Sequence, residues 1–139
     1  MKRLRLMGLT AALTAAALAL MGAQRPAVFA QLAPGLWEFS GLPGAKIPLR
    51  QCVADVSSFA QFEHRGLSCS RDVITDNPGS AVVEYSCGGA GFGHSRLEVV
   101  TPRSLRIDTQ GVSNKLPFSY VVQARRLGDC SATTPAPRH

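Results

Sequence analysis

The chain has 139 residues, of which 45% are hydrophobic and 17% charged, and its formal net charge is +6. Four of its 15 basic residues lie in the first thirty positions, which leaves 11 basic against 9 acidic residues in the rest. The remaining charges are interspersed, as in Arg71-Asp72, so the clustered cations that nucleic-acid binding requires are missing. Nucleic acid is therefore excluded as an expected partner.

The first thirty residues have the pattern of a cleaved export signal. Basic residues precede an apolar run over residues 6–21, and Val28-Phe29-Ala30 offers small residues at the spacing that signal peptidase reads. The run is shorter than the roughly 20 residues that a transmembrane helix needs, so we expect no stable membrane anchor after cleavage. Cleavage is expected after Ala30, with cleavage after Ala23 as the alternative. General secretion would deliver the mature chain to the periplasm.

The mature chain has the pattern of an all-β domain, because apolar and polar residues alternate between turns that contain Gly and Pro. We expect seven short strands, at residues 35–40, 47–53, 68–76, 81–87, 92–100, 104–110 and 117–126. One short helix is expected between Cys52 and Cys69, with Asp55 as its N-cap. The strands predict an antiparallel meander, curved or forming a partly closed barrel, over residues 31–130. A disordered tail is expected at 131–139.

Two turns are predicted in detail. Asn77-Pro78-Gly79-Ser80 favours a type II turn, in which Gly79 would have a positive φ. Pro102 marks the tip of the clearest hairpin, because proline lacks the amide hydrogen of a central strand. One register for that hairpin places apolar pairs on one face and opposite charges on the other. It pairs Val99 with Leu105, Leu97 with Ile107, Glu98 with Arg106 and Arg96 with Asp108.

The four cysteines predict structural disulfides, because no C-x-x-C pair of a redox or zinc site is present. The turn after residue 76 brings Cys69 beside Cys87, directly opposite it if one strand carries a bulge. Cys52 and Cys130 would then tie the beginning of the meander to its end. The pairing of Cys52 with Cys69 and of Cys87 with Cys130 stays open, since the segment between the first two is short enough to be stapled across a helix.

No catalytic or cofactor motif is found. The glycine-rich residues 88–93 do not fit a phosphate-binding loop, and we interpret them as a flexible or bulged connection where the backbone passes close to something. His94 precedes Ser95 on a strand, where neighbouring side chains point to opposite faces, so it cannot simply activate that serine. His64 is expected to be hydrogen-bonded or to face solvent. We therefore expect no enzyme activity, no cofactor and no metal site.

Trp37 is the single tryptophan, and its simplest role is that of a core anchor. Gly35-Leu36-Trp37 on the first strand is also similar to the G-x-W motif of lipocalins, in which the tryptophan packs against an arginine of the last strand. Arg125 or Arg126 would take that place. A carrier of a small apolar ligand would need an open half-barrel. Its candidate ligand-lining residues are Trp37, Phe118, Tyr120 and Val122.

A second resemblance covers nearly the whole mature domain. The residues that carry it are Pro34-Gly35-Leu36-Trp37-Glu38, Gln51-Cys52-Val53, Cys69, Cys87 and Arg125-Arg126-Leu127-Gly128-Asp129-Cys130. They resemble the bacterial exported family catalogued as domain of unknown function 3617. The resemblance implies a periplasmic, cysteine-paired β domain without an assigned activity. We expect a non-catalytic domain for binding or envelope maintenance. The alternatives are a carrier of a small apolar ligand and a protein-interaction module, such as an inhibitor of an envelope enzyme.

Overall fold

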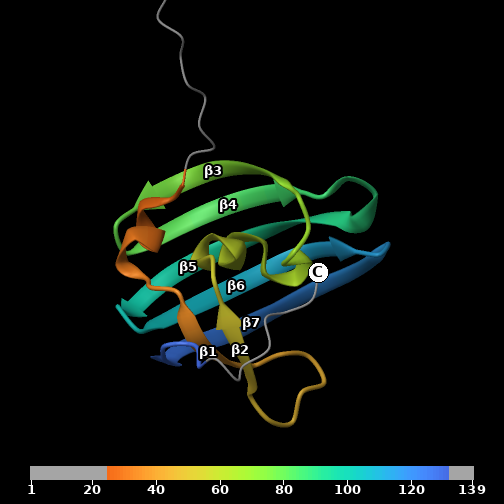
Figure 1. The fold of residues 1–139 in the computed structure, drawn as a ribbon. Helices are drawn as coiled ribbons and strands as arrows, with labels where there is room; N and C mark the ends of the chain where they lie inside the picture. The colour runs from red at the N-terminus through yellow and green to blue at the C-terminus, as the bar shows by residue number, and fades with distance from the viewer. Residues whose placement is uncertain (1–24, 132–139) are drawn as a thin grey trace, which may run out of the picture.

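The alternating pattern of the chain folds into one antiparallel sheet of seven strands in the order β2-β1-β7-β6-β5-β4-β3 (Figure 1). The computed structural model describes residues 25–131, so most of the expected signal, the bond after Ala23 and residues 132–139 lie outside the described part. The strands are β1 (Gly35–Ser40), β2 (Leu49–Val53), β3 (Ser70–Asn77), β4 (Ser80–Ser86), β5 (Gly91–Thr101), β6 (Ser104–Ser113) and β7 (Leu116–Gly128). The all-β prediction is confirmed.

The order of the strands leaves the sheet open. β3 to β7 follow one another as a meander of hairpins, and β1 lies between β7 and β2. The first and last strands are therefore neighbours, with Phe39 opposite Ala124. β2 and β3 form the two edges, so the fold is a curved sheet and not a closed barrel.

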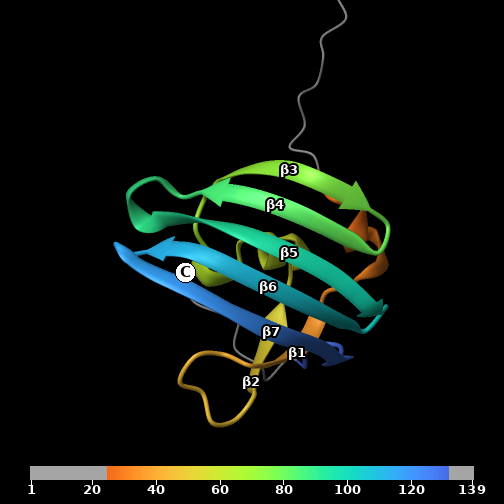
Figure 2. The same ribbon diagram turned by 180° about the vertical axis from the view of Figure 1, so that it is seen from behind.

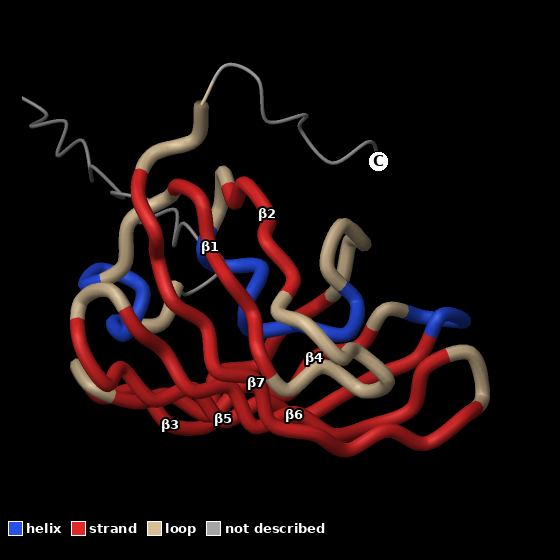
Figure 3. The backbone as a smooth tube through the Cα atoms, turned by 90° about the horizontal axis from the view of Figure 1, so that it is seen from below, coloured by secondary structure: helices blue, strands red, loops and turns tan. Residues whose placement is uncertain are grey.

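The predicted short helix is confirmed as η2 (Val56–His64), a 3-10 segment that kinks at Gln61. Asp55 caps it, because its carboxylate accepts a hydrogen bond from the amide of Ser57 at 2.9 Å. The segment lies inside the curve of the sheet (Figures 1 and 3). Phe59 of η2 packs edge-on against Trp37 and Phe39, with ring centroids 5.1 and 5.7 Å apart. η2 therefore covers the centre of the inner face of the sheet.

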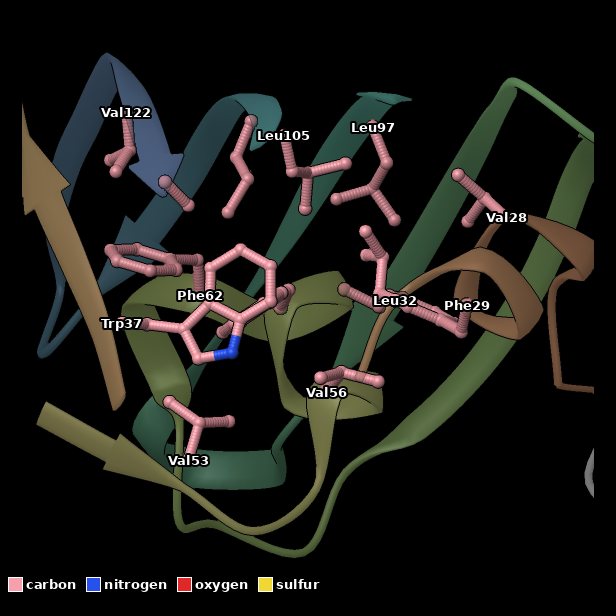
Figure 4. Close-up of a cluster of buried hydrophobic side chains, with 14 of the residues drawn as sticks. Val28, Phe29, Leu32, Trp37, Val53, Val56, Phe62, Leu97, Leu105 and Val122 are labelled. Carbon is pink, nitrogen blue, oxygen red and sulfur yellow. The ribbon is translucent and has the colours of Figure 1, made fainter. Parts of the chain in front are cut away.

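A second short helix, η1 (Ala27–Gln31), packs on the same side of the sheet. Val28 and Phe29 are 0% and 2% exposed, and with Leu32 they belong to the hydrophobic core (Figure 4). The folded unit thus begins before Gln31, where the signal pattern predicts the start of the mature domain. A few apolar residues look the same in a cleavage region and in a core, so the pattern alone does not separate the two.

The hairpin at Pro102 has the predicted register. Leu97 lies opposite Ile107 and Glu98 opposite Arg106. Leu97, Leu105 and Ile107 are fully buried, whereas Glu98 forms exposed ion pairs with Arg96 and Arg106 at 3.2 and 3.9 Å. A single pairing of the two strands therefore places the apolar side chains inward and the charged side chains outward.

The hairpin at Pro78 differs from its prediction in the turn type. Gly79 does not have the positive φ of a type II turn, so that prediction is wrong. Its carbonyl instead accepts a hydrogen bond from the amide of Val99 at 2.9 Å, which ties the turn to β5. The turn therefore has a hydrogen-bond partner on a third strand, which the residues of the turn alone do not reveal.

The same hairpin contains the expected bulge, between Val73 and Thr75. The bulge shifts the register so that Ser70 pairs with Ser86, which places Cys69 directly across from Cys87. The two form a disulfide, and Cys52 forms the other with Cys130. The predicted pairing is confirmed, and the alternative of Cys52 with Cys69 is excluded.

Candidate binding groove on the outer face of the sheet

A hollow of about 700 Å³ lies on the outer face of the sheet, the face turned away from η2 and seen in Figure 2. Side chains of β3 to β7 line it. The lining residues are Ser70, Asp72, Glu84, Tyr85, Ser86, Phe92, Gly93, His94, Gln110, Gly111, Phe118 and Ser119. We call this hollow the outer groove.

The strand register explains the shape of the outer groove. Its lining residues fall in three neighbouring rows across the strands. One row is Asp72, Glu84, His94, Gln110 and Ser119, and another contains Ser70, Ser86 and Phe92. The row between them is Tyr85, Gly93, Gly111 and Phe118. Because successive residues of a strand point to opposite faces, the positions of this row face inward. The outer groove therefore runs between two rows of outward side chains, over the backbone of the middle row.

Two glycines occupy the centre of that middle row. Gly93 lies directly opposite Gly111 in the β5–β6 pair. A Cβ atom at Gly93 would collide with the hydroxyl and ring of Tyr85, and one at Gly111 would collide with the carbonyl of Phe92. Glycine is required here because neighbouring groups pack against the backbone. The backbone of the glycine-rich connection was expected to pass close to another group, and at Gly93 it does so.

The outer groove carries negative charge. Asp72 and Glu84 are exposed carboxylates, and none of the described residues that line the groove is lysine or arginine. The basic side chain among the described lining residues is His94, whose Nδ1 lies 3.7 Å from Oε1 of Glu84. Glu38, on another part of the sheet, is by contrast held by Arg50 and Arg125 at 2.8 and 3.0 Å. The carboxylates of the groove are therefore available to a cation from outside.

Apolar surface lies beside these carboxylates, since Phe92 is 55% exposed. Gln110 and Ser119 add amide and hydroxyl groups that donate or accept hydrogen bonds. The groove can thus recognise an ammonium or guanidinium group through its carboxylates and an apolar group through the Phe92 ring.

Polar residues also gather on the inner face, but they bond to one another. His64 and Tyr85 are each 4% exposed, and Ser95 and Thr109 are fully buried. Nε2 of His64 donates to the Ala90 carbonyl at 3.2 Å, because a carbonyl can only accept, and in the neutral imidazole Nδ1 then accepts from the Tyr85 hydroxyl at 3.3 Å. Burial raises the pKa of Tyr85 to about 12, which keeps this donor protonated. The cluster is satisfied internally, as expected for His64.

His94 and Ser95 occupy opposite faces, as predicted. His94 lines the outer groove, whereas Ser95 is fully buried and shares a hydrogen bond of 3.1 Å with Thr109. The imidazole and this hydroxyl are therefore separated by the sheet.

The four candidate ligand-lining residues do not surround one opening. Trp37 and Val122 are fully buried in the core beneath η2. Phe118 and Tyr120 lie further along the inner face, where the Tyr120 hydroxyl donates to Glu63 at 2.5 Å. Phe118 is the member of this set that also belongs to the lining of the outer groove.

The two candidate arginine partners of Trp37 have different contacts. Arg126 lies opposite Trp37 in the β1–β7 pair. Its guanidinium donates to the Pro34 carbonyl at 2.9 Å and pairs with Asp129. Arg125 instead pairs with Glu38. Arg126 thus holds the start of β1 against the end of β7.

Sequence reasoning missed the residues of the outer groove. Asp72, Glu84 and Gln110 each look like one surface residue of a strand, and Phe92 looks like part of a glycine-rich connection. They meet only when the registers of four strand pairs are combined. The hairpin at Pro102 already predicts which residues share its outer face, and the same reasoning extended across β3 to β7 would have found this row.

Comparison of the chain with family models, curated proteins and solved structures finds no match. Within residues 25–131, no helix is long and apolar enough to cross a membrane. The same described residues contain no group of three His, Cys, Asp or Glu side chains placed to hold a metal ion. The two disulfides indicate an oxidising, extracytoplasmic compartment.

Proposed function

We propose that this chain is a non-catalytic periplasmic binding domain, exported by a general secretory signal, whose ligand is a small organic cation with an apolar part. The outer groove is its binding site. Membership in the family catalogued as domain of unknown function 3617 is part of the same proposal, because that resemblance also implies an exported β domain.

The observation that carries the proposal is the combination, in one hollow, of an exposed aromatic ring and two carboxylates with no lysine or arginine among the described lining residues. Its volume of about 700 Å³ falls in the range of roughly 300–1,000 Å³ that is typical of small-molecule sites. Asp72 and Glu84 would accept hydrogen bonds from the cationic group, while Phe92 would cover the apolar part. A ligand of this kind complements both features.

The inner face supports a carrier of apolar ligands less well. Phe59 of η2 lies against Trp37 and Phe39 at the centre of that face. A ligand lined by Trp37 and Val122 would have to displace η2 and its capped N-terminus. The outer groove requires no such rearrangement.

The proposal can be tested by NMR titration of the isotope-labelled exported protein. Phenethylamine and benzamidine serve as cationic probes, and 2-phenylethanol and benzamide as neutral probes of similar shape. We expect saturable shifts of the Phe92, His94 and Gln110 signals with the cations. The neutral probes should bind roughly tenfold more weakly, since one charge-assisted hydrogen bond contributes about 1.5 kcal/mol or more. Equal binding of both kinds of probe would contradict the assignment.

Matched variants separate the groove from general surface charge. Asp72→Asn with Glu84→Gln removes both carboxylates of the groove and should abolish the difference between cations and neutral probes. Glu98→Gln with Asp108→Asn removes two carboxylates from the same outer face, beyond the lining of the groove. This variant should leave the difference between cations and neutral probes unchanged. Loss of binding in both double variants would indicate unspecific attraction. A lysine-containing peptide that binds the groove in place of the small cations would favour a protein partner.

A further inference from the structure

The segment ahead of β1 closes one side of the core. Pro26, Val28, Phe29 and Leu32 are buried, and η1 packs against β3, β4 and β5. Figure 4 shows Val28, Phe29 and Leu32 on the same side of the core as Leu97. Val28, Phe29 and Leu32 of this segment are therefore as much a part of the hydrophobic core as the strands that they cover.

Polar contacts hold the same segment in place at three points. The amide of Ala27 donates to Asp76 of β3 at 2.7 Å, and the side-chain amide of Gln31 donates to the Pro78 carbonyl. Arg25 pairs with the helix cap Asp55 at 3.5 Å. These contacts reach the β3–β4 hairpin and the start of η2, so the segment connects elements that are distant in sequence.

A cut after Ala30 is incompatible with this packing. It would place Val28 and Phe29 on the discarded peptide, divide η1 and put a charged amine at Gln31. The remaining domain would expose the core surface that these two side chains cover. Val28 and Phe29, which suit a signal peptidase site before Ala30, are thus residues that the fold needs.

We infer that the export signal is removed upstream of this segment, by hydrolysis of the peptide bond between Ala23 and Gln24. Water supplies the hydroxyl of the new Ala23 carboxylate and a proton of the new Gln24 amine, and the host's membrane-bound signal peptidase is the catalyst. The cut follows the apolar run of residues 6–21 by two residues. It leaves every described residue in the mature protein. The inference depends on export but not on the ligand of the outer groove.

The N-terminus of the protein exported from a Gram-negative host tests this directly. Intact-mass and peptide mass spectrometry should find a chain that begins at Gln24, as glutamine or in its cyclised form. A chain that begins at Gln31 or retains Met1 would overturn the inference.

Two substitutions provide matched controls for the cleavage. Ala23→Leu should block the cut, because signal peptidase requires a small residue before the bond, and the precursor should accumulate. Ala30→Leu should leave both the N-terminus and the fold unchanged, since Ala30 is exposed. Accumulation of the precursor with Ala30→Leu alone would show that the bond after Ala30 is used.

A folding measurement provides an independent readout. Chains that start at Gln24, Pro26 and Gln31 are refolded with their disulfides and compared in thermal unfolding. The first two should unfold at similar temperatures, because Pro26 onward carries the buried residues and the ion pair of Arg25 is exposed. The chain from Gln31 should unfold roughly 10 °C lower or lose its cooperative transition. Equal midpoints for all three would overturn the structural part of the inference.

Discussion

Gly93 is the residue at which the outer groove and the buried polar cluster depend on each other. Its backbone lies in the middle row of the groove, and the Tyr85 ring occupies the space where a side chain would project. We expect Gly93→Ala to lower the free energy of unfolding by about 1–3 kcal/mol, because the added methyl group must displace Tyr85 or the backbone.

Gly89→Ala is the control for this substitution. A Cβ atom added at Gly89 would meet no neighbouring atom within 4 Å, and the φ angle of Gly89 is not positive. Alanine there should leave stability unchanged or raise it by about 0.4–1 kcal/mol. Urea unfolding measures both variants, and equal stabilities would show that Tyr85 does not restrict Gly93.

Asp55 makes the start of η2 sensitive to acid. The Ser57 hydroxyl and amide donate to its carboxylate at 2.7 and 2.9 Å, and these bonds hold the pKa of Asp55 below its ordinary value of 3.8. A carboxyl group with a lowered folded pKa contributes stability that is complete above the unfolded pKa and is lost as the pH falls through the folded value.

Asp55→Asn tests this contribution, since asparagine is also a good N-cap but does not titrate. We expect the free-energy advantage of the wild type over Asp55→Asn to be constant near neutral pH. It should shrink as the pH falls below 3.8. Chemical unfolding of both proteins down to about pH 2 measures the difference. A difference that does not change with pH would mean that the carboxylate contributes nothing beyond the asparagine cap.

Among the elements, the β5–β6 hairpin gives the sharpest test of register. Glu98→Lys places a third cation beside Arg96 and Arg106 on the exposed face and should cost about 0.2–1 kcal/mol. Leu97→Asp buries an unpaired charge and should cost several times more. Urea unfolding compares the two, and similar small losses would mean that the inward face is assigned wrongly.

The strands of this domain could be predicted from the sequence because alternation and turn residues are local signals. The same signals predicted the register at Pro102, where both faces of one hairpin constrain it. η1 was missed, since Val28 and Phe29 also fit the end of an export signal. The prediction of a type II turn at Pro78 was wrong, and the hydrogen bond of Gly79 with Val99 of another strand is not visible in the residues of the turn. The outer groove could not be predicted from local signals, because its residues lie on different strands. Asp72 of β3 and Ser119 of β7 are separated by three strands of the sheet.

At the scale of the whole molecule, the two disulfides enclose loops of very different size. Their cysteines are 78 and 18 positions apart in Cys52–Cys130 and Cys69–Cys87. The chain-entropy model gives about 4.5 kcal/mol for the long loop and about 3 kcal/mol for the short one. Replacing both cysteines of a pair with serine should therefore cost more for Cys52–Cys130. Denaturant unfolding of the two double variants decides the order, and a larger loss for Cys69–Cys87 would contradict it.

If the chain is exported as proposed, the position of β1 between β7 and β2 also sets the order in which the sheet can be completed during secretion. A polypeptide that leaves a membrane pore from its N-terminus presents β1 and β2 first, while the partner of β1 on its other side is the last strand of the sheet. A lone two-stranded hairpin is marginally stable in water. The β1–β2 hairpin would therefore have no stable place in the sheet until β7 has emerged. Cys130 follows β7, so the disulfide with Cys52 can form only after nearly the whole domain has been translocated.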